Sequence, residues 1–194
     1  MKRKTQLMMS LLPILILASS HSTAVTVKGV DIPDEVILEQ NTLVLNGAGI
    51  RSKFVFDIYI GALYLAKKQS TADAIINDPG PQQVSMHFVY DEVSAEKMRN
   101  GWNDGFANVL NEDALKKLQP QIESFNQAFG NTVAGDVIHV QYTPKTGTTV
   151  VVNNTTKASI PRYDFHQALM KIWLGNDPVD ADLKQGMLGK NKAD

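Results

Sequence analysis

Residues 50–65, IRSKFVFDIYIGALYL, decide the fold, because they form the longest run of β-branched and aromatic residues in the chain. Alternate side chains of a strand point to opposite faces, so the run divides into two sets. The apolar set is Phe54, Phe56, Ile58, Ile60 and Ala62. The mixed set is Arg51, Lys53, Val55, Asp57 and Tyr59. We predict one strand with Arg51 and Tyr59 on the same face; either both faces of its sheet are partly covered, or Arg51 lies in the preceding turn.

The segments on either side of this run predict an α+β domain. Upstream, Asn46-Gly47-Ala48-Gly49 indicates a turn after a short strand over 42–45. Further strands are predicted over 84–90, 137–143, 148–152 and 156–160, the last three as a meander. Longer helices are predicted over 94–111, 115–129, 164–174 and 180–188, with Pro120 bending or breaking the second and a capping box over 164–167. We therefore expect an antiparallel sheet with helices layered on one face.

Composition describes an ordinary single domain. The chain has 194 residues, 19 Lys and Arg against 20 Asp and Glu, and no Cys. A net charge of −1 provides no basic surface for nucleic acid, so no nucleic-acid partner is predicted. The absence of Cys excludes disulfides, thiol nucleophiles and Cys-ligated zinc.

Residues 1–24 have the pattern of a signal peptide. Lys2, Arg3 and Lys4 precede an apolar stretch over 7–18, and Ser22-Thr23-Ala24 supplies small residues for cleavage. The apolar stretch is shorter than the roughly 20 residues that span a bilayer, so no stable membrane anchor is expected after cleavage. Loss of the three basic residues changes the net charge from −1 to −4. We predict a periplasmic or secreted bacterial protein, with its domain over 25–190 and a polar tail over 191–194.

Most catalytic motifs are absent from the sequence. It has no Gly-x-Ser-x-Gly elbow, no His-Glu-x-x-His helix and no phosphate-binding loop. Gly47-Ala48-Gly49 lies between two predicted strands, which is the wrong context for a dinucleotide-binding turn. His87, His139 and His166 are dispersed, so neither a metal nor a cofactor is predicted.

Two features could form a ligand site. Arg51 stands at the start of the apolar run, where a permanently charged guanidinium could anchor a carboxylate or phenolate. From the sequence alone a solvated arginine at the start of the strand is the more common case, because arginine is mostly exposed. Trp102 and Phe106 repeat at helical spacing, which is typical of a core and also suits one wall of a ligand cavity.

Three segments together resemble the chalcone isomerase fold family, in its bacterial exported branch. The first runs from Gly47 through Arg51 to Leu65, and the second from Gly135-Asp136 through Pro144 and Gly147. The third runs from Phe165 to Leu188 and includes Ile172-Trp173-Leu174-Gly175. The resemblance covers nearly all of 25–190 and implies an open-faced β-sandwich with a ligand cleft between sheet and helices. It also implies that Arg51 polarises the substrate, as in the isomerases, or holds a carboxylate, as in the fatty-acid binders.

The other polar residues of the isomerase site do not carry over. Tyr59 stands where the isomerases have a threonine, Lys97 near their tyrosine, and Asp104 near their helix asparagine. We therefore predict a non-catalytic protein that binds a fatty acid or similar amphiphilic carboxylate. The predicted ligand-binding residues are Arg51, Tyr59, Lys97, Trp102 and Asp104. One alternative is an isomerase or lyase of an unsaturated carbonyl compound, with Arg51 and Tyr59 as catalytic candidates; another is a ligand-free scaffold with a filled cleft and an exposed apolar patch.

Overall fold

A computed structural model describes residues 24–190 of the chain, so the predicted leader, apart from Ala24, and the predicted tail lie outside the described residues. Seven antiparallel strands form the main sheet in the order β11-β10-β9-β6-β5-β4-β3. These strands are β3 (Glu35–Leu38), β4 (Asn41–Lys53), β5 (Phe56–Leu65), β6 (Gln82–Phe88), β9 (Val137–Thr143), β10 (Gly147–Val152) and β11 (Thr155–Ile160). Two small sheets pair β1 (Ala24–Val27) with β2 (Val30–Pro33), and β7 (Glu92–Val93) with β8 (Thr132–Val133).

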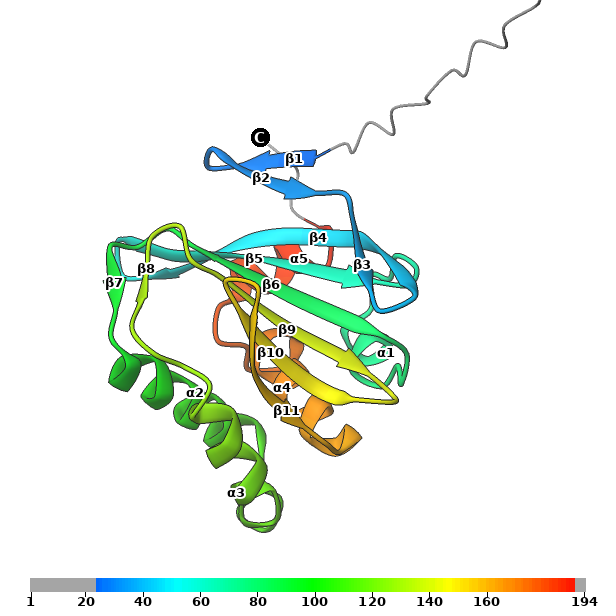
Figure 1. Cartoon of the computed structure of the whole chain (residues 1–194), viewed down its shortest axis with the longest axis vertical. Helices are drawn as coiled ribbons and strands as arrows, with labels where there is room; N and C mark the ends of the chain where they lie inside the picture. The colour runs from blue at the N-terminus through cyan, green and yellow to red at the C-terminus, as the bar shows by residue number, and fades with distance from the viewer. Residues whose placement is uncertain (1–23, 191–194) are drawn as a thin grey trace, which may run out of the picture.

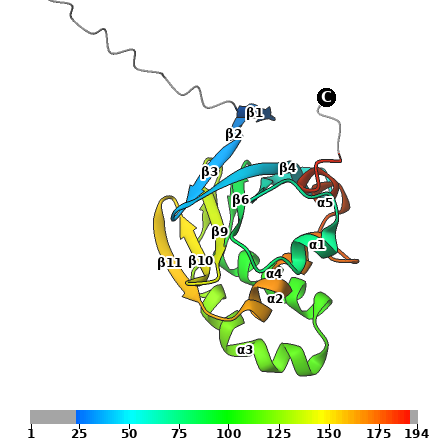
Figure 2. The same cartoon turned by 90° about the vertical axis from the view of Figure 1, so that its right-hand side faces the viewer.

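The helices lie together against one face of the curled main sheet (Figures 1 and 2). They are α1 (Ala72–Ile76), α2 (Ala95–Val109), α3 (Glu112–Asn126), α4 (Tyr163–Leu174) and α5 (Ala181–Met187). The expected α+β class, with helices over an antiparallel sheet, is therefore confirmed. Among residues 24–190, no helix is long and apolar enough to cross a membrane.

The run over 50–65 is a hairpin, and the prediction of a single strand is wrong. β4 ends at Lys53 and β5 begins at Phe56, which leaves Phe54 and Val55 as a two-residue turn. Phe54 adopts a φ of 58°, a conformation that bulky residues rarely take. The turn contains none of the Gly, Asn or Asp residues that usually announce such a turn. Alternation in the sequence therefore continues through the place where the chain reverses.

Residues 46–49 lie inside β4, so the turn predicted there is also wrong. Gly47 and Gly49 pair with Leu63 and Gly61 of β5, next to a bulge at Asn46. A Cβ on Gly47 would overlap the carbonyl of Gly186, and one on Gly186 would overlap the carbonyl of Ala48. These glycines serve a close approach between β4 and α5 rather than a reversal of the chain.

Both faces of β5 are covered. Of the two possibilities that the sequence left open, partial covering of both sheet faces is therefore the one that the structure shows, and Arg51 lies within β4 rather than in a turn. Tyr59, Leu63 and Leu65 belong to the large core under the helices. Ile60, Ala62 and Tyr64 pack in a second, smaller core with Ile32 of the β1–β2 hairpin. The mixed face that carries Arg51 and Tyr59 is thus the one that faces the helices, and the hairpin covers much of the apolar face.

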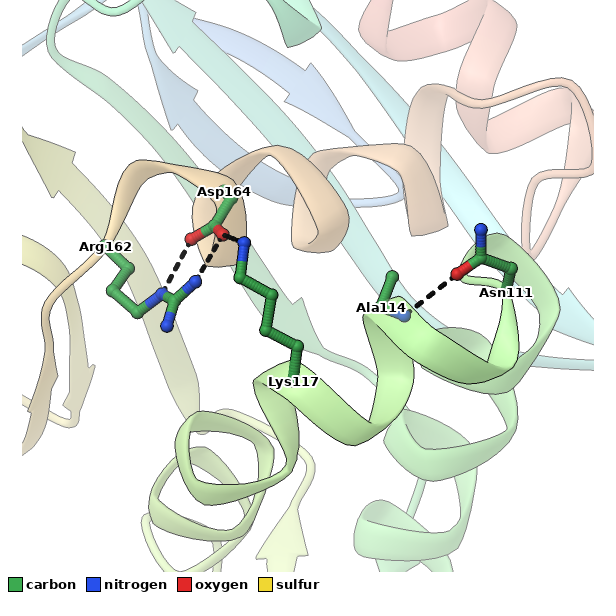
Figure 3. A network of polar contacts seen from close by, with 5 residues as sticks. All are labelled: Asn111, Ala114, Lys117, Arg162 and Asp164. Carbon is green, nitrogen blue, oxygen red and sulfur yellow. Dashed lines mark hydrogen bonds and ion pairs between the residues drawn. The ribbon is translucent and has the colours of Figure 1, made fainter.

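The helix ends depart from the sequence patterns in two places. Pro120 lies within α3 without breaking it; Pro120 is exposed, so water can reach the carbonyl group that lacks its usual donor. α4 begins after Arg162 without a side-chain cap, so the capping box expected over 164–167 is wrong. Instead, Asp164 accepts hydrogen bonds from Arg162 Nε at 2.9 Å and Nη2 at 2.6 Å. Lys117 of α3 reaches the same carboxylate at 3.3 Å and so links α3 to α4, while Asn111 caps α3 through the Ala114 amide (Figure 3).

Candidate functional site

A cavity of about 500 Å³ lies between the helix-facing side of the sheet and helices α2 and α4. Its floor includes Arg51, Tyr59 and Phe88 from three adjacent strands, and its walls include Trp102 and Trp173. The size falls within the usual range for small-molecule sites, roughly 300–1,000 Å³. All five residues predicted for the ligand site line this cavity: Arg51, Tyr59, Lys97, Trp102 and Asp104.

Arg51 and Tyr59 are brought together by the β4–β5 hairpin. They are directly paired across the two strands, so their side chains share the face toward the helices. The sequence placed them on one face through the regular alternation of a single strand. The structure shows that strand pairing is the cause, with a bulge at Ile58 of β5 that shifts the register toward the turn.

Arg51 is half-buried and has little that neutralises it. Its Nη1 donates a long hydrogen bond of 3.5 Å to the carbonyl of Ser52. Within residues 24–190, no carboxylate lies within salt-bridge distance of its guanidinium. Asp180 is held by other partners, because its oxygens accept the amides of Ser52 at 3.0 Å and Leu183 at 2.9 Å. Most of the donor capacity of Arg51 is therefore available to a ligand.

Tyr59 is a buried hydrogen-bonding group beside this cation. Only 5% of the residue is exposed, and its hydroxyl oxygen accepts the indole N–H of Trp173 at 3.0 Å. Burial raises the pKa of Tyr59 to about 12, although the nearby charge of Arg51 and the Trp173 hydrogen bond act in the opposite direction. Tyr59 is accordingly a neutral hydroxyl at ordinary pH, able to donate a hydrogen bond but poorly suited to lose its proton.

Aromatic rings make the inner wall of the cavity rigid. Trp102 packs edge-on against Trp173, with centroids 5.5 Å apart, and against Phe125 at 5.0 Å. The Tyr59 ring lies 5.5 Å from Phe88. Trp102 is thus both a core residue and a wall of the cavity, the two roles that its helical spacing left open. Such packed rings give an apolar surface that changes little on binding.

Lys97 and Asp104 contribute to the rim, since both are exposed residues of α2. Gly101, between them on the same helix, also lines the cavity, and a Cβ built there meets nothing within 4 Å. The glycine leaves open space on the side of α2 that borders the cavity.

Several lining residues were not identified from the sequence. Ile172 and Trp173 enter the sequence analysis only through the family resemblance, and Met86 and Met98 only as residues of a predicted strand and helix. Trp173 stands in the apolar run Ile172-Trp173-Leu174, where nothing in the local pattern distinguishes a cavity wall from the core. Phe54 and Phe56, predicted on the apolar face of one strand, instead lie at the mouth of the cavity, 93% and 53% exposed.

The described residues offer no cluster for a metal ion: within 24–190 no three His, Asp or Glu side chains come together as ligands would. His166 is buried in the core, where it stacks on Tyr142 with centroids 4.1 Å apart and hydrogen-bonds to Gln82 at 3.1 Å. These contacts give it a structural environment away from the cavity.

The fold and the site define an α+β protein with a ligand-sized cavity between its antiparallel sheet and its helical layer. Arg51 lies on the floor of that cavity. A family described as chalcone isomerase-like matches residues 24–189, and the chain belongs to that family. Among solved structures, the chain resembles a fatty-acid-binding protein of Arabidopsis thaliana, with a TM-score of 0.64 and 15% identity. The match covers 87% of this chain and 96% of the plant protein, which at this identity establishes a shared fold. No curated protein sequence matches the chain.

Proposed function

We propose that the protein binds a fatty acid, or a similar amphiphilic carboxylate, in this cavity without transforming it. The observation that carries the proposal is Arg51, a half-buried cation on the cavity floor with no carboxylate partner among residues 24–190. A ligand carboxylate would supply the missing charge and accept the guanidinium donors in pairs. The name of the plant relative supports this ligand class.

The two chemical halves of an amphiphile match two parts of the cavity. Arg51 and the Tyr59 hydroxyl can hold the head group, because one provides charge and the other a neutral donor on the adjacent strand. Met86, Met98 and the two tryptophans, Trp102 and Trp173, can contact the hydrocarbon part of the ligand, since their side chains are largely apolar and already packed. Anchoring at one end and apolar contact along the rest is the usual design of small-molecule sites.

Binding fits the site better than acid–base catalysis does. A general acid or base works best with a pKa near the working pH, whereas burial raises that of Tyr59 to about 12. The adjacency of Arg51 and Tyr59 nevertheless favours one second candidate, an isomerase or lyase in which Arg51 polarises an unsaturated carbonyl and Tyr59 donates a proton. This activity predicts turnover of such a compound that Tyr59→Phe abolishes, whereas a binding protein returns the compound unchanged.

The decisive experiment is a titration of delipidated protein with a fluorescent fatty acid. Arg51→Ala should weaken binding by about tenfold or more, since hydrogen bonds to charged groups are worth roughly 1.5–3 kcal/mol. Arg99→Ala is the matched control, because Arg99 is a partly buried arginine of α2 that does not line the cavity. Equal affinities for wild type and Arg51→Ala would remove the anchor role. Native mass spectrometry of the protein from its own cells would separate a bound lipid from a small metabolite or a partner protein.

We also propose that the protein is exported to a bacterial periplasm or beyond. The support is the pattern of residues 1–24, in which three basic residues precede a short apolar stretch and a small-residue cleavage site. Leu15→Arg should interrupt the apolar stretch and retain the protein in the cytoplasm, as cell fractionation would show. If wild type and Leu15→Arg both remain in the cytoplasm, the export proposal is wrong.

A further inference from the structure

The turn between β4 and β5 exposes more apolar side chain than any other described part of the chain. Phe54 is 93% exposed, Val55 is 87% exposed and Phe56 is 53% exposed. We call these three consecutive residues the apolar tip. The tip lies at the end of the sheet where β7 leads into α2 (Figure 1). Scattered exposed apolar residues are common, but three in a row at a turn need a reason.

Local structure does not supply that reason. A two-residue hairpin turn favours Asn-Gly or Asp-Gly, because the central residues need positive φ. Here Phe54 takes a φ of 58° with a bulky side chain that solvent surrounds. Phe56 contacts Tyr90 edge-on at 5.5 Å, but Phe54 and Val55 belong to neither apolar core. The same two residues, Phe54 and Val55, thus form an unfavourable turn and expose apolar surface to water.

The tip borders the cavity. Lys53, Phe54 and Phe56 line its mouth, while Arg51 lies on the floor of the same cavity, two positions before Lys53 in β4. Anything that contacts the tip therefore stands at the entrance to the site. A ligand released by whatever the tip contacts can enter the cavity directly.

The shape and charge of the tip suit a lipid surface. It is a projecting turn rather than a groove, so it can penetrate a soft apolar medium. Lys53 is exposed at its base, and a lysine there can keep its ammonium among lipid head groups. The nearby carboxylate of Asp57 is already paired, with Lys28 at 2.5 Å and Ser52 at 2.7 Å. The net charge of −4 predicted without the leader opposes attraction to anionic membranes, so apolar insertion has to carry the contact.

We propose that the apolar tip inserts into the surface of a lipid bilayer and holds the cavity mouth against it, so that an amphiphile passes between bilayer and cavity. This inference rests on the proposed binding function for the transfer step, whereas the insertion step stands on the tip alone. The contact would be peripheral and reversible, because only two or three side chains enter the bilayer.

The absence of cysteine makes insertion directly measurable. Val55→Cys in the full chain provides one labelling site for the environment-sensitive fluorophore NBD, and Lys157→Cys provides an exposed control on edge strand β11, with three strands between it and β5. With phosphatidylcholine vesicles, the label at 55 should brighten, shift to shorter wavelength and be quenched by doxyl-labelled lipid, while the label at 157 should not. An unchanged label at 55 would overturn the proposal. So would a change that follows protein concentration without vesicles, which would indicate pairing of two copies through the tip.

Transfer is tested with Val55→Asp, because Val55 does not line the cavity. This variant should bind a fluorescent fatty acid in solution as wild type does, yet take it from vesicles about tenfold more slowly, since a carboxylate opposes insertion. Equal transfer rates would overturn the role of the tip in delivery. Failure of both proteins to bind the fatty acid in solution would instead refute the proposed function, and the label at 55 would still report on insertion.

Discussion

The indole N–H of Trp173 donates a 3.0 Å hydrogen bond to the hydroxyl oxygen of Tyr59, and this bond decides how Tyr59 can be used. Since the oxygen is an acceptor toward Trp173, the hydroxyl hydrogen remains free to point elsewhere. Tyr59 lines the cavity beside Arg51, so the hydrogen is available to a ligand carboxylate. α4 thereby orients a donor that β5 carries.

Alkaline pH should destabilise the protein through Tyr59. Its pKa is about 12 in the folded state against an ordinary value of 10, so the unfolded chain loses this proton first. Stability is complete below pH 10 and falls at about 1.4 kcal/mol per pH unit between pH 10 and 12. Tyr59→Phe should flatten that fall in urea unfolding measured across this range. Tyr64, whose pKa burial also raises, will keep part of the slope in the variant. An identical slope in wild type and Tyr59→Phe would contradict the burial of a neutral Tyr59.

Acid should also destabilise the protein, through His166. Burial lowers its pKa from 6.5 to about 3, with the neutral groups of Gln82, Tyr142 and Tyr163 around it. The unfolded chain therefore takes up a proton first, and stability present above pH 6.5 declines as pH falls toward 3. His166→Gln should show a smaller loss of stability between pH 7 and 4 than wild type, whatever its stability at pH 7. Parallel curves for the two proteins would show that burial does not lower the pKa of His166.

A large side chain on α2 beside the cavity should weaken binding without unfolding the protein. Gly101→Leu places a large side chain at a lining position where a Cβ meets nothing, and leucine favours a helix by roughly 0.5–1 kcal/mol over glycine. The expected result is a fatty-acid affinity lowered by about tenfold or more with an unchanged or raised melting temperature. Gly101→Ala, measured beside it, should retain most of the affinity. Full affinity in Gly101→Leu would place the ligand elsewhere.

A methyl group at residue 186 should disrupt the packing of α5 on β4. The added Cβ of Gly186→Ala would overlap the carbonyl of Ala48 and lie 2.5 Å from Gly49 Cα, and both are backbone groups. Overpacking of this kind costs about 1–3 kcal/mol, which denaturant unfolding resolves. Gly130→Ala is the control, because a Cβ at residue 130 meets nothing and its φ is ordinary. Comparable stability of the two variants would show that α5 can shift away at little cost.

The sequence predicted the layered architecture better than the chain reversals. Period-two and period-3.6 patterns depend on which side of an element is buried, and they found the meander and α2 to within two residues at either end. The reversal at Phe54-Val55 carries no turn residue, whereas Gly47-Ala48-Gly49 resembles a turn but serves helix packing. The first error arises because bulky residues occupy the turn, and the second because the use of these glycines depends on contacts with distant α5.

The site was predictable in its polar residues and in one aromatic wall, Trp102. Arg51 is unusual for its position in the sequence and could be singled out, and Tyr59 followed from it because the two lie an even number of positions apart. Trp173 lies more than 100 positions later, and its contact with Tyr59 depends on how α4 crosses the sheet. Residue spacing cannot reveal such a contact.

The glycine contact between β4 and α5 also has a consequence for how the chain folds. β4 comes early in the chain and α5 is the last of the described helices, yet Gly47 and Gly49 of β4 pack directly against the backbone of α5. A nascent chain lacking its last 14 residues, from Ala181 onward, exposes the glycine strip of β4 and leaves Leu183 and Met187 out of the core. Native contacts of such long sequence separation form late and slow folding. The packing of β4 in the native core must therefore wait until α5 has been made.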